Sequence, residues 1–179
     1  MRKDLMRDFT VSEVFPDVKH IRDPLCVHMT LLLGRERALL FDAGYGVLDF
    51  HAFIRGITDL PLTLVLSHGH HEHALGAMHF PSSLMLPQDL PVFREYTGRR
   101  EREKIAVTAR LGSKARENYL SASIPEPEKL DAAVFELGGL SVQVIRTPGH
   151  TPGSIALYVP ERRLLLLGDQ RVSKEGVVV

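Results

Sequence analysis

The sequence lacks the features that mark disulfide-rich, membrane-spanning and nucleic-acid-binding proteins. Its 179 residues include one cysteine, Cys26, which excludes a disulfide framework and a structural zinc site built from cysteines. It contains no tryptophan, and 22 lysine and arginine residues balance 22 aspartate and glutamate residues. A formal charge of zero argues against nucleic acid as a partner, because that contact needs a basic surface.

Long apolar segments are missing as well. No apolar run approaches the roughly 20 residues of a membrane-spanning helix, so we expect no membrane partner. The charged N-terminus is not followed by the apolar segment of a secretory signal. We therefore expect a cytoplasmic protein.

The chain alternates between strand and helix patterns, and its length suits one domain over residues 1–179. Apolar residues at helical spacing predict a helix within 47–57. The segment 89–120 is also rich in helix signals, and Gly112 predicts a break between two helices there. We expect this segment to belong to a helical insertion at about 88–125. Strand signals cover 11–15, 27–33, 37–42, 62–67, 82–86, 132–136, 140–145, 154–159 and 163–167. This order predicts an α/β (α+β) fold with two sheets packed face to face and helices outside.

Histidine is the residue that the sequence has in excess, with nine copies. Four of them, with one glutamate, stand in Ser67-His-Gly-His-His-Glu-His73, directly after an apolar strand. In an extended segment His68 and His70 point the same way and can bind one ion together. Glu72 and His73 follow where the chain turns. Neutral imidazoles suit zinc and related metals, and a carboxylate adds charge.

Two further motifs follow other predicted strands. His150 lies in Thr147-Pro-Gly-His-Thr-Pro-Gly153, a tight turn after the strand 140–145. Asp169 ends the segment Leu167-Gly-Asp, after the strand 163–167. Each would be an ordinary turn residue if it stood alone. Residues 41–44, Phe-Asp-Ala-Gly, form a similar strand end earlier in the chain, at Asp42.

Taken together and in this order, these motifs resemble those of the metallo-β-lactamase superfamily from about residue 10 to 170. The first motif of that family is His-x-His-x-Asp-His, and here it is His68-Gly-His-His-Glu-His73. The resemblance implies a four-layer αβ/βα sandwich of two mixed β-sheets with outer helices. It places the metals at one edge, between the sheets.

The resemblance also implies a role for each motif residue. His68, His70 and His150 would hold a first metal ion. Glu72 and His73 would help to hold a second, and Asp169 would bridge the two. Asp42 would support the metal loop from nearby. The remaining histidines match no ligand motif, and we expect His71 to point away from the first metal and the others to be structural or surface residues: His20, His28, His51 and His79.

Two departures from the family pattern concern the second metal. Glu72 replaces the usual aspartate and is longer by one methylene. The family also supplies a further histidine beyond the Gly-Asp motif, and this sequence has no histidine after His150. Either the sequence lacks a C-terminal part of the fold, or the protein works with a weak or absent second metal.

The implied chemistry is hydrolysis by Zn²⁺, with one or two ions per chain and with Fe or Mn as further options. Zinc lowers the pKa of its water towards about 7, and the resulting hydroxide would attack an acyl compound such as a thioester or lactone. Asp169 could orient the hydroxide, and Glu72 or Asp169 could carry its proton, so both are candidate catalytic residues. Two alternatives stay open: an iron-containing redox protein of the same fold, and a metal-binding protein without turnover.

The charged segment from Arg94 to Glu117 allows two interpretations. Its eight lysine and arginine residues and four glutamates can form a solvated helix face. They can also form a lid or homodimer element that receives the anionic tail of a small-molecule substrate. Because loops and insertions over a rigid scaffold carry much of the functional diversity of a fold, we expect this segment to influence substrate choice.

Overall fold

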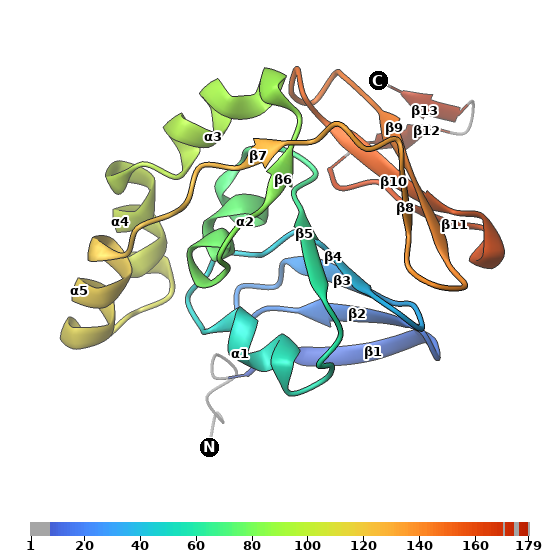
Figure 1. The fold of residues 1–179 in the computed structure, drawn as a ribbon. Coiled ribbons are helices and arrows are strands. Elements are labelled where there is room, and N and C mark those ends of the chain that lie inside the picture. Colours follow the sequence, from blue (N-terminus) through green and yellow to red (C-terminus); the bar gives the residue numbers. More distant parts are fainter. Residues whose placement is uncertain (1–7, 170, 174–175, 179) are drawn as a thin grey trace.

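The computed structural model describes residues 8–169, 171–173 and 176–178, and the chain folds there around two packed β-sheets (Figure 1). The larger sheet has seven strands in sequence order. They are β1 (Thr10–Phe15), β2 (Val18–Arg22), β3 (His28–Leu33), β4 (Ala38–Phe41), β5 (Leu62–Val65), β6 (Leu84–Met85) and β7 (Glu128–Lys129). β1 to β4 pair antiparallel, whereas β4 to β7 pair parallel.

The smaller sheet has four strands in the order β11-β10-β9-β8, all antiparallel. They are β8 (Val134–Glu136), β9 (Ser141–Arg146), β10 (Ile155–Val159) and β11 (Leu164–Leu166). A separate hairpin pairs β12 (Arg171–Ser173) with β13 (Gly176–Val178).

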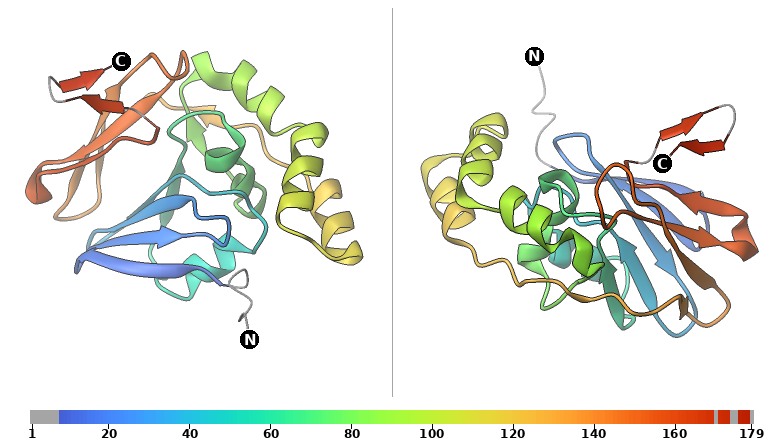
Figure 2. Two further views of the ribbon diagram at one scale, coloured as in Figure 1. Left: turned by 180° about the vertical axis from the view of Figure 1, so that it is seen from behind. Right: turned by 90° about the horizontal axis from the view of Figure 1, so that it is seen from above.

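The helices lie on the face of the larger sheet that points away from the smaller sheet (Figures 1 and 2). They are α1 (Phe50–Arg55), α2 (His71–Ala74), α3 (Leu90–Tyr96), α4 (Arg99–Thr108) and α5 (Ser113–Ser121), with a 3-10 turn at Leu75–His79. Asp49 begins α1 by accepting the Ala52 N–H at 3.0 Å, which satisfies one of the free N–H groups of the first turn. No described helix is long and apolar enough to cross a membrane.

Two apolar layers hold the sheets and helices together, and β4 contributes to both. Leu40 packs in a cluster with buried residues of α1, α2 and α3, whereas Leu39 and Phe41 pack between the two sheets. Leu39 and Leu40 are fully buried. Adjacent residues of a strand point to opposite faces, so a strand covered on both faces is apolar throughout. This is why residues 38–41 show no polar alternation.

The structure confirms the α/β class, the two packed sheets and the outer helices, and it corrects three details. The smaller sheet is antiparallel and not mixed, because consecutive strands joined by short connections pair antiparallel. Within the described residues only the larger sheet carries α-helices, so three of the four expected layers are present. No α-helix covers the outer face of the smaller sheet there, and Ile145 and Leu165 are exposed. The segment 89–120 forms three helices, since the chain also breaks at Gly98. Its status as an insertion, and a homodimer built on it, stay predictions.

The buried position of β4 allows a test of the packing. Leu40→Ala removes a fully buried side chain from the layer between sheet and helices, and we expect it to lower the free energy of unfolding by about 2–5 kcal/mol. Val107→Ala, at a side chain that is 64% exposed, is the control and should change it by less than about 0.5 kcal/mol. Urea denaturation of both variants measures the difference. A similar small loss in both would show that Leu40 does not pack as described.

Candidate metal centre

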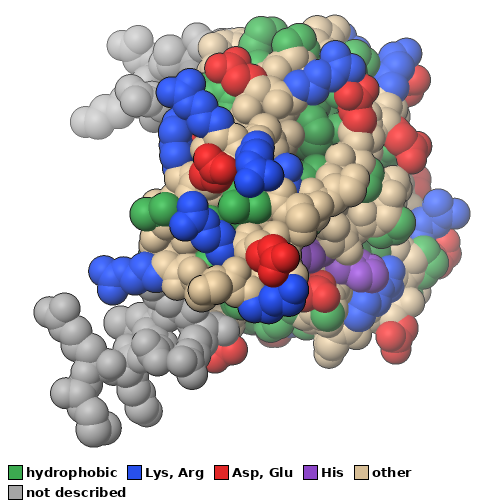
Figure 3. Space-filling view, turned by 90° about the vertical axis from the view of Figure 1, so that its left-hand side faces the viewer, with side chains coloured by type: hydrophobic (Ala, Val, Ile, Leu, Met, Phe, Trp, Pro, Cys, Tyr) green, Lys and Arg blue, Asp and Glu red, His purple; other side chains and the backbone are tan. Residues whose placement is uncertain are grey.

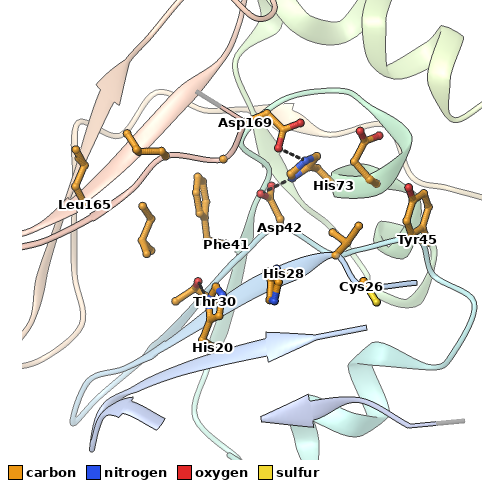
Figure 4. A pocket seen from close by; sticks show the side chains of 15 residues that line it. His20, Cys26, His28, Thr30, Phe41, Asp42, Tyr45, His73, Leu165 and Asp169 are labelled. Atoms are coloured by element: carbon orange, nitrogen blue, oxygen red, sulfur yellow. Dashed lines mark hydrogen bonds and ion pairs between the residues drawn. The ribbon is translucent and has the colours of Figure 1, made fainter. Parts of the chain in front are cut away.

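Four chain segments bring the predicted ligands to one edge of the sandwich. Asp42 follows β4, and the loop 66–70 follows β5, its parallel neighbour, and continues into α2 with Glu72 and His73. The loop 147–154 connects β9 to β10, and Asp169 follows β11. Figure 4 shows Asp169, from the smaller sheet, directed toward His73 and Asp42 of the larger one. The two sheets therefore supply opposite sides of one cluster.

Three imidazoles form the first group of candidate ligands. The Nδ1 atom of His70 lies 3.1 Å from Nε2 of His68 and 3.0 Å from Nε2 of His150. His68 is buried, whereas His150 is on the exposed side of the cluster. The sequence predicted this set, and the structure brings its three nitrogen atoms together.

A second group shares His68 with the first and adds His73 and Asp169. Nε2 of His73 lies 3.0 Å from Oδ1 of Asp169. The other carboxylate oxygen of Asp169 lies 3.7 Å from Nε2 of His150, so this side chain stands between the two groups. That position agrees with the expected bridging role, which stays a prediction.

Asp42 and Ser67 orient the buried imidazoles. Oδ2 of Asp42 lies 2.8 Å from Nδ1 of His73, and its Oδ1 accepts the Ser67 N–H at 2.7 Å. Oγ of Ser67 in turn lies 2.9 Å from Nδ1 of His68. With both Nδ1 atoms engaged, the Nε2 atoms of His68 and His73 face the cluster. Asp42 adopts φ +68°, a left-handed backbone that is uncommon outside glycine and asparagine or aspartate.

The electrostatics of the two groups differ. Burial, with the neighbouring His73 and His70, lowers the pKa of His68 to about 2, so its ring is neutral. Burial alone would also lower the pKa of His73, but Asp42 and Asp169 raise it to about 10. The hydrogen bond from His73 lowers the pKa of Asp169 to about 2. The cluster thus combines a neutral imidazole, His68, with an ion pair between His73 and Asp169.

Asp89 joins the two ligand loops and was not predicted from the sequence. It is fully buried, its Oδ2 accepts the Gly69 N–H at 2.6 Å, and its Oδ1 accepts the Gly153 N–H at 2.7 Å. Gly69 directly follows His68, and Gly153 lies in the same turn as His150, three residues after it. One carboxylate therefore fixes the distance between both histidine loops.

The two glycines are required by how closely the backbones approach. A Cβ atom on Gly153 would lie 2.7 Å from Cβ of Asp89, and one on Gly69 would lie 2.5 Å from the backbone nitrogen of Phe93. Real Cβ atoms do not come this close. Any larger residue at either position would push its loop away from residues 89–93.

Glu72 is the predicted ligand that the structure places in neither group. Its Oε2 lies 3.3 Å from Nδ1 of His71, which is outside both groups as well. The ring of His71 stacks on Tyr96 of α3, with ring centroids 5.7 Å apart, and the same Tyr96 lies 4.4 Å from the ring of His70. Glu72 does line the adjoining cavity. Its ligand and proton-carrier roles stay predictions.

The cavity next to the cluster contains two histidines that the sequence left without a role. Its volume is about 500 Å³, and Glu72, His73 and Asp169 line one part of it. His20 and His28, expected to be structural or surface residues, line another part (Figure 4). No motif marked them, because only strand pairing brings β2 and β3 beside the ligand loops.

Most of the charges on α4 and α5 have partners nearby. Arg99 pairs with Glu103, Lys104 with Glu101, and Lys114 with Glu117. Nη1 of Arg102 donates to the carbonyl oxygens of Tyr119 and Ala122 and so joins α4 to α5. Figure 3 shows the mixture of both signs on this side of the molecule. The arrangement agrees with a solvated helix face, and Arg102 is a structural residue.

The donor atoms suit a transition metal. Ligands about 2.1 Å from a tetrahedral zinc ion are separated by about 3.4 Å, and the nitrogen atoms of the first group lie 3.0 and 3.1 Å apart. The second group, with two imidazoles and one carboxylate, also has all its ligand atoms within 4.8 Å of one another. Both donor sets are of the kind that zinc and iron accept.

Comparison with known families identifies the fold. A family model described as the metallo-beta-lactamase superfamily matches residues 22–178. The chain belongs to the metallo-beta-lactamase superfamily. Members of this superfamily usually bind metal ions, which agrees with the two groups of donors.

Curated relatives within the superfamily are longer than this chain. The "Probable metallo-hydrolase YqgX" of Bacillus subtilis is 25% identical over 147 residues, which are 82% of this chain and 66% of that protein. "Acyl-coenzyme A thioesterase MBLAC2" of Gallus gallus is 27% identical over 154 residues, which are 78% of this chain and 55% of that protein. The chain thus spans between about half and two thirds of the length of these relatives.

Solved structures of the superfamily share the fold. A beta-lactamase domain protein from Burkholderia ambifaria matches with a TM-score of 0.63 and 17% identity, over 94% of this chain and 59% of that one. A metallo-beta-lactamase family protein from Thermus thermophilus matches with a TM-score of 0.58 and 23% identity, over 90% of this chain and 62% of that one.

The Asp89 bridge predicts an effect on the metal centre. Asp89→Asn keeps the shape but directs an NH₂ group at one of the two N–H donors, so one loop loses its acceptor. We expect metal affinity to fall about 10- to 100-fold and the free energy of unfolding to fall by about 1–3 kcal/mol. Zinc titration and urea denaturation measure the two effects, with the exposed Asp59→Asn as control. Unchanged zinc affinity in Asp89→Asn would contradict the role of the bridge.

Proposed function

We propose that this chain carries the metal centre of a zinc-dependent hydrolase that cleaves acyl compounds, thioesters first among them. The observation that supports this most is the pair of donor groups that share His68 and have Asp169 between them. Membership of the superfamily and the names of two relatives, a probable metallo-hydrolase and an acyl-coenzyme A thioesterase, agree with hydrolysis. A cytoplasmic location and a small-molecule substrate, expected from the sequence, belong to the same proposal.

In this proposal His68, His70 and His150 hold the first metal ion, and His73 and Asp169 hold the second. Glu72, outside both groups as it stands, would join the second only by a change of side-chain conformation. When bound, zinc supplies a Lewis acid for the substrate carbonyl and lowers the pKa of water towards about 7. The second ion, with fewer histidine ligands, would be the weaker one.

The chain's own residues supply orientation and proton handling. Asp42 and Ser67 hold the buried imidazoles so that their Nε2 atoms face the cluster. Asp169, a carboxylate at neutral pH, can accept the proton of an attacking water at Oδ2, while His73 holds Oδ1. Tyr96 covers the ring of His70 and limits its movement.

The metal assignment predicts the stoichiometry. Zinc titrated into chelator-treated protein should bind in one tight step followed by a weaker one. His150→Ala should lower the affinity of the tight step more than about 100-fold, because loss of a metal ligand costs more affinity than loss of a residue that only hydrogen-bonds to a ligand. His51→Ala, outside both groups, is the matched control. Metal analysis of protein purified without added metal identifies the native ion. No rebinding of zinc or iron would overturn the proposal, and iron without hydrolysis would favour the redox alternative.

The role of Asp169 predicts a loss of turnover. Asp169→Asn retains the shape of the side chain and removes its charge, so we expect kcat to fall about 100-fold or more while the fold is kept. Activity is measured on a panel of acyl-coenzyme A thioesters, a lactone and a phosphodiester. An Asn variant as active as the parent would make the Gly168-Asp169 motif structural. Full metal binding without hydrolysis of any member of the panel would favour a metal-binding protein without turnover.

A further inference from the structure

The face of the larger sheet that is turned toward the smaller sheet is apolar where the smaller sheet covers it and polar where that cover ends. Val18 of β2 and Leu32 of β3 are fully buried beneath the smaller sheet. Further along the same strands and on the same face, the side chains become polar or charged. Together with the facing residues of β1, they form a surface that we call the polar floor: Thr10, Ser12, His20, Arg22, His28 and Thr30.

Strand pairing fixes the order of the polar floor. His20 pairs with Thr30 on one side and Ser12 on the other, and Arg22 pairs with His28 and Thr10. The rings of His20 and His28 are stacked, with centroids 4.6 Å apart and an interplanar angle of 10°. On the opposite face, Ile21 and Met29 are buried in the core between the sheet and the helices. A shift of the pairing register by one residue would expose them, so the register is fixed.

Two cavities meet at this histidine pair. The cavity of about 500 Å³ leads from His73 and Asp169 to His20 and His28. A second one, of about 250 Å³, begins at the same two histidines and continues to Arg22, Thr10 and Ser12. The polar floor is thus the far part of a groove that starts at the metal centre. Figure 4 shows His20, His28 and Thr30 along this wall.

The lining of the second cavity consists of groups that donate hydrogen bonds to anions. It contains one guanidinium, two imidazoles and two hydroxyls, and no carboxylate. No carboxylate of residues 8–169 lies within ion-pair distance of Arg22. Burial and the nearby His28 lower the pKa of His20, so its ring offers an N–H as a neutral donor. A planar guanidinium beside such donors suits a phosphate or carboxylate group.

We propose that the polar floor binds an anionic group of the substrate, phosphate or carboxylate, on an arm that extends about 10 Å beyond β4, the strand that ends next to Asp42. That reach follows from the sheet, since His20 lies two strands from Phe41 of β4 and strands are about 4.8 Å apart. The inference rests on the proposed function and adds to it the charge of the substrate and the place where that charge binds. It assigns to the first three strands the binding of an anionic substrate group, which was one of the two interpretations of residues 94–117.

The kinetic test compares two thioesters that differ by one phosphate, S-acetyl-4′-phosphopantetheine and S-acetyl-pantetheine. The variant is Arg22→Gln with His28→Gln, both at exposed positions, and Arg37→Gln, exposed at the other end of the sheet, is the control. We expect the double variant to raise KM for the phosphorylated thioester about 10- to 100-fold, to leave its kcat unchanged, and to leave the neutral thioester unaffected. Equal effects on both thioesters, or none on either, would overturn the proposal.

A binding measurement keeps this test independent of turnover. Inorganic phosphate and, separately, succinate are titrated into the zinc-loaded protein while the imidazole signals of His20 and His28 are followed by NMR. Saturable shifts of these signals that disappear in Arg22→Gln support the anion site even if no thioester is hydrolysed, and the probe that binds more tightly identifies the anion. Shifts confined to His68, His70 and His150 would overturn it while leaving the metal centre in place.

Discussion

The candidate metal centre depends on the hydrogen bonds of a buried carboxylate that belongs to neither histidine loop. Asp89 accepts one N–H from the loop of His68 and one from the loop of His150, and the two contacts hold segments of different sheets at a fixed distance. Gly69 and Gly153 allow this approach, because neither carries a Cβ atom. This contact therefore determines where the imidazoles meet.

Polar side chains behind the ligands then set the direction of each ring. Asp42 engages His73, and Ser67 engages His68, so both Nε2 atoms are directed to the same place. The left-handed backbone of Asp42 is uncommon for a residue other than glycine, and it serves two hydrogen bonds at once. Asp169 then completes the cluster from the smaller sheet.

The larger sheet has different tasks along its strands. β4 and the second half of β5 are buried on both faces, and Asp42 and the loop of His68 follow directly at their ends. β1 to β3 extend beyond the cover of the smaller sheet and present the polar floor beside the metal centre. In our proposal one rigid sheet therefore holds His68, His70 and His73 of the metal centre together with the part of the groove that selects the substrate.

The sequence by itself determined the family, the two-sheet class and the motifs of His68, His150 and Asp169, because these signals are local: a few residues at the end of an apolar strand. The tertiary structure decided what depends on contacts between distant segments. Asp89 reaches Gly153 across 64 positions, and His20 and His28 meet the cavity only through strand pairing. Glu72 stood in the ligand motif, yet lies outside both donor groups, since spacing along the chain does not fix where a longer side chain points.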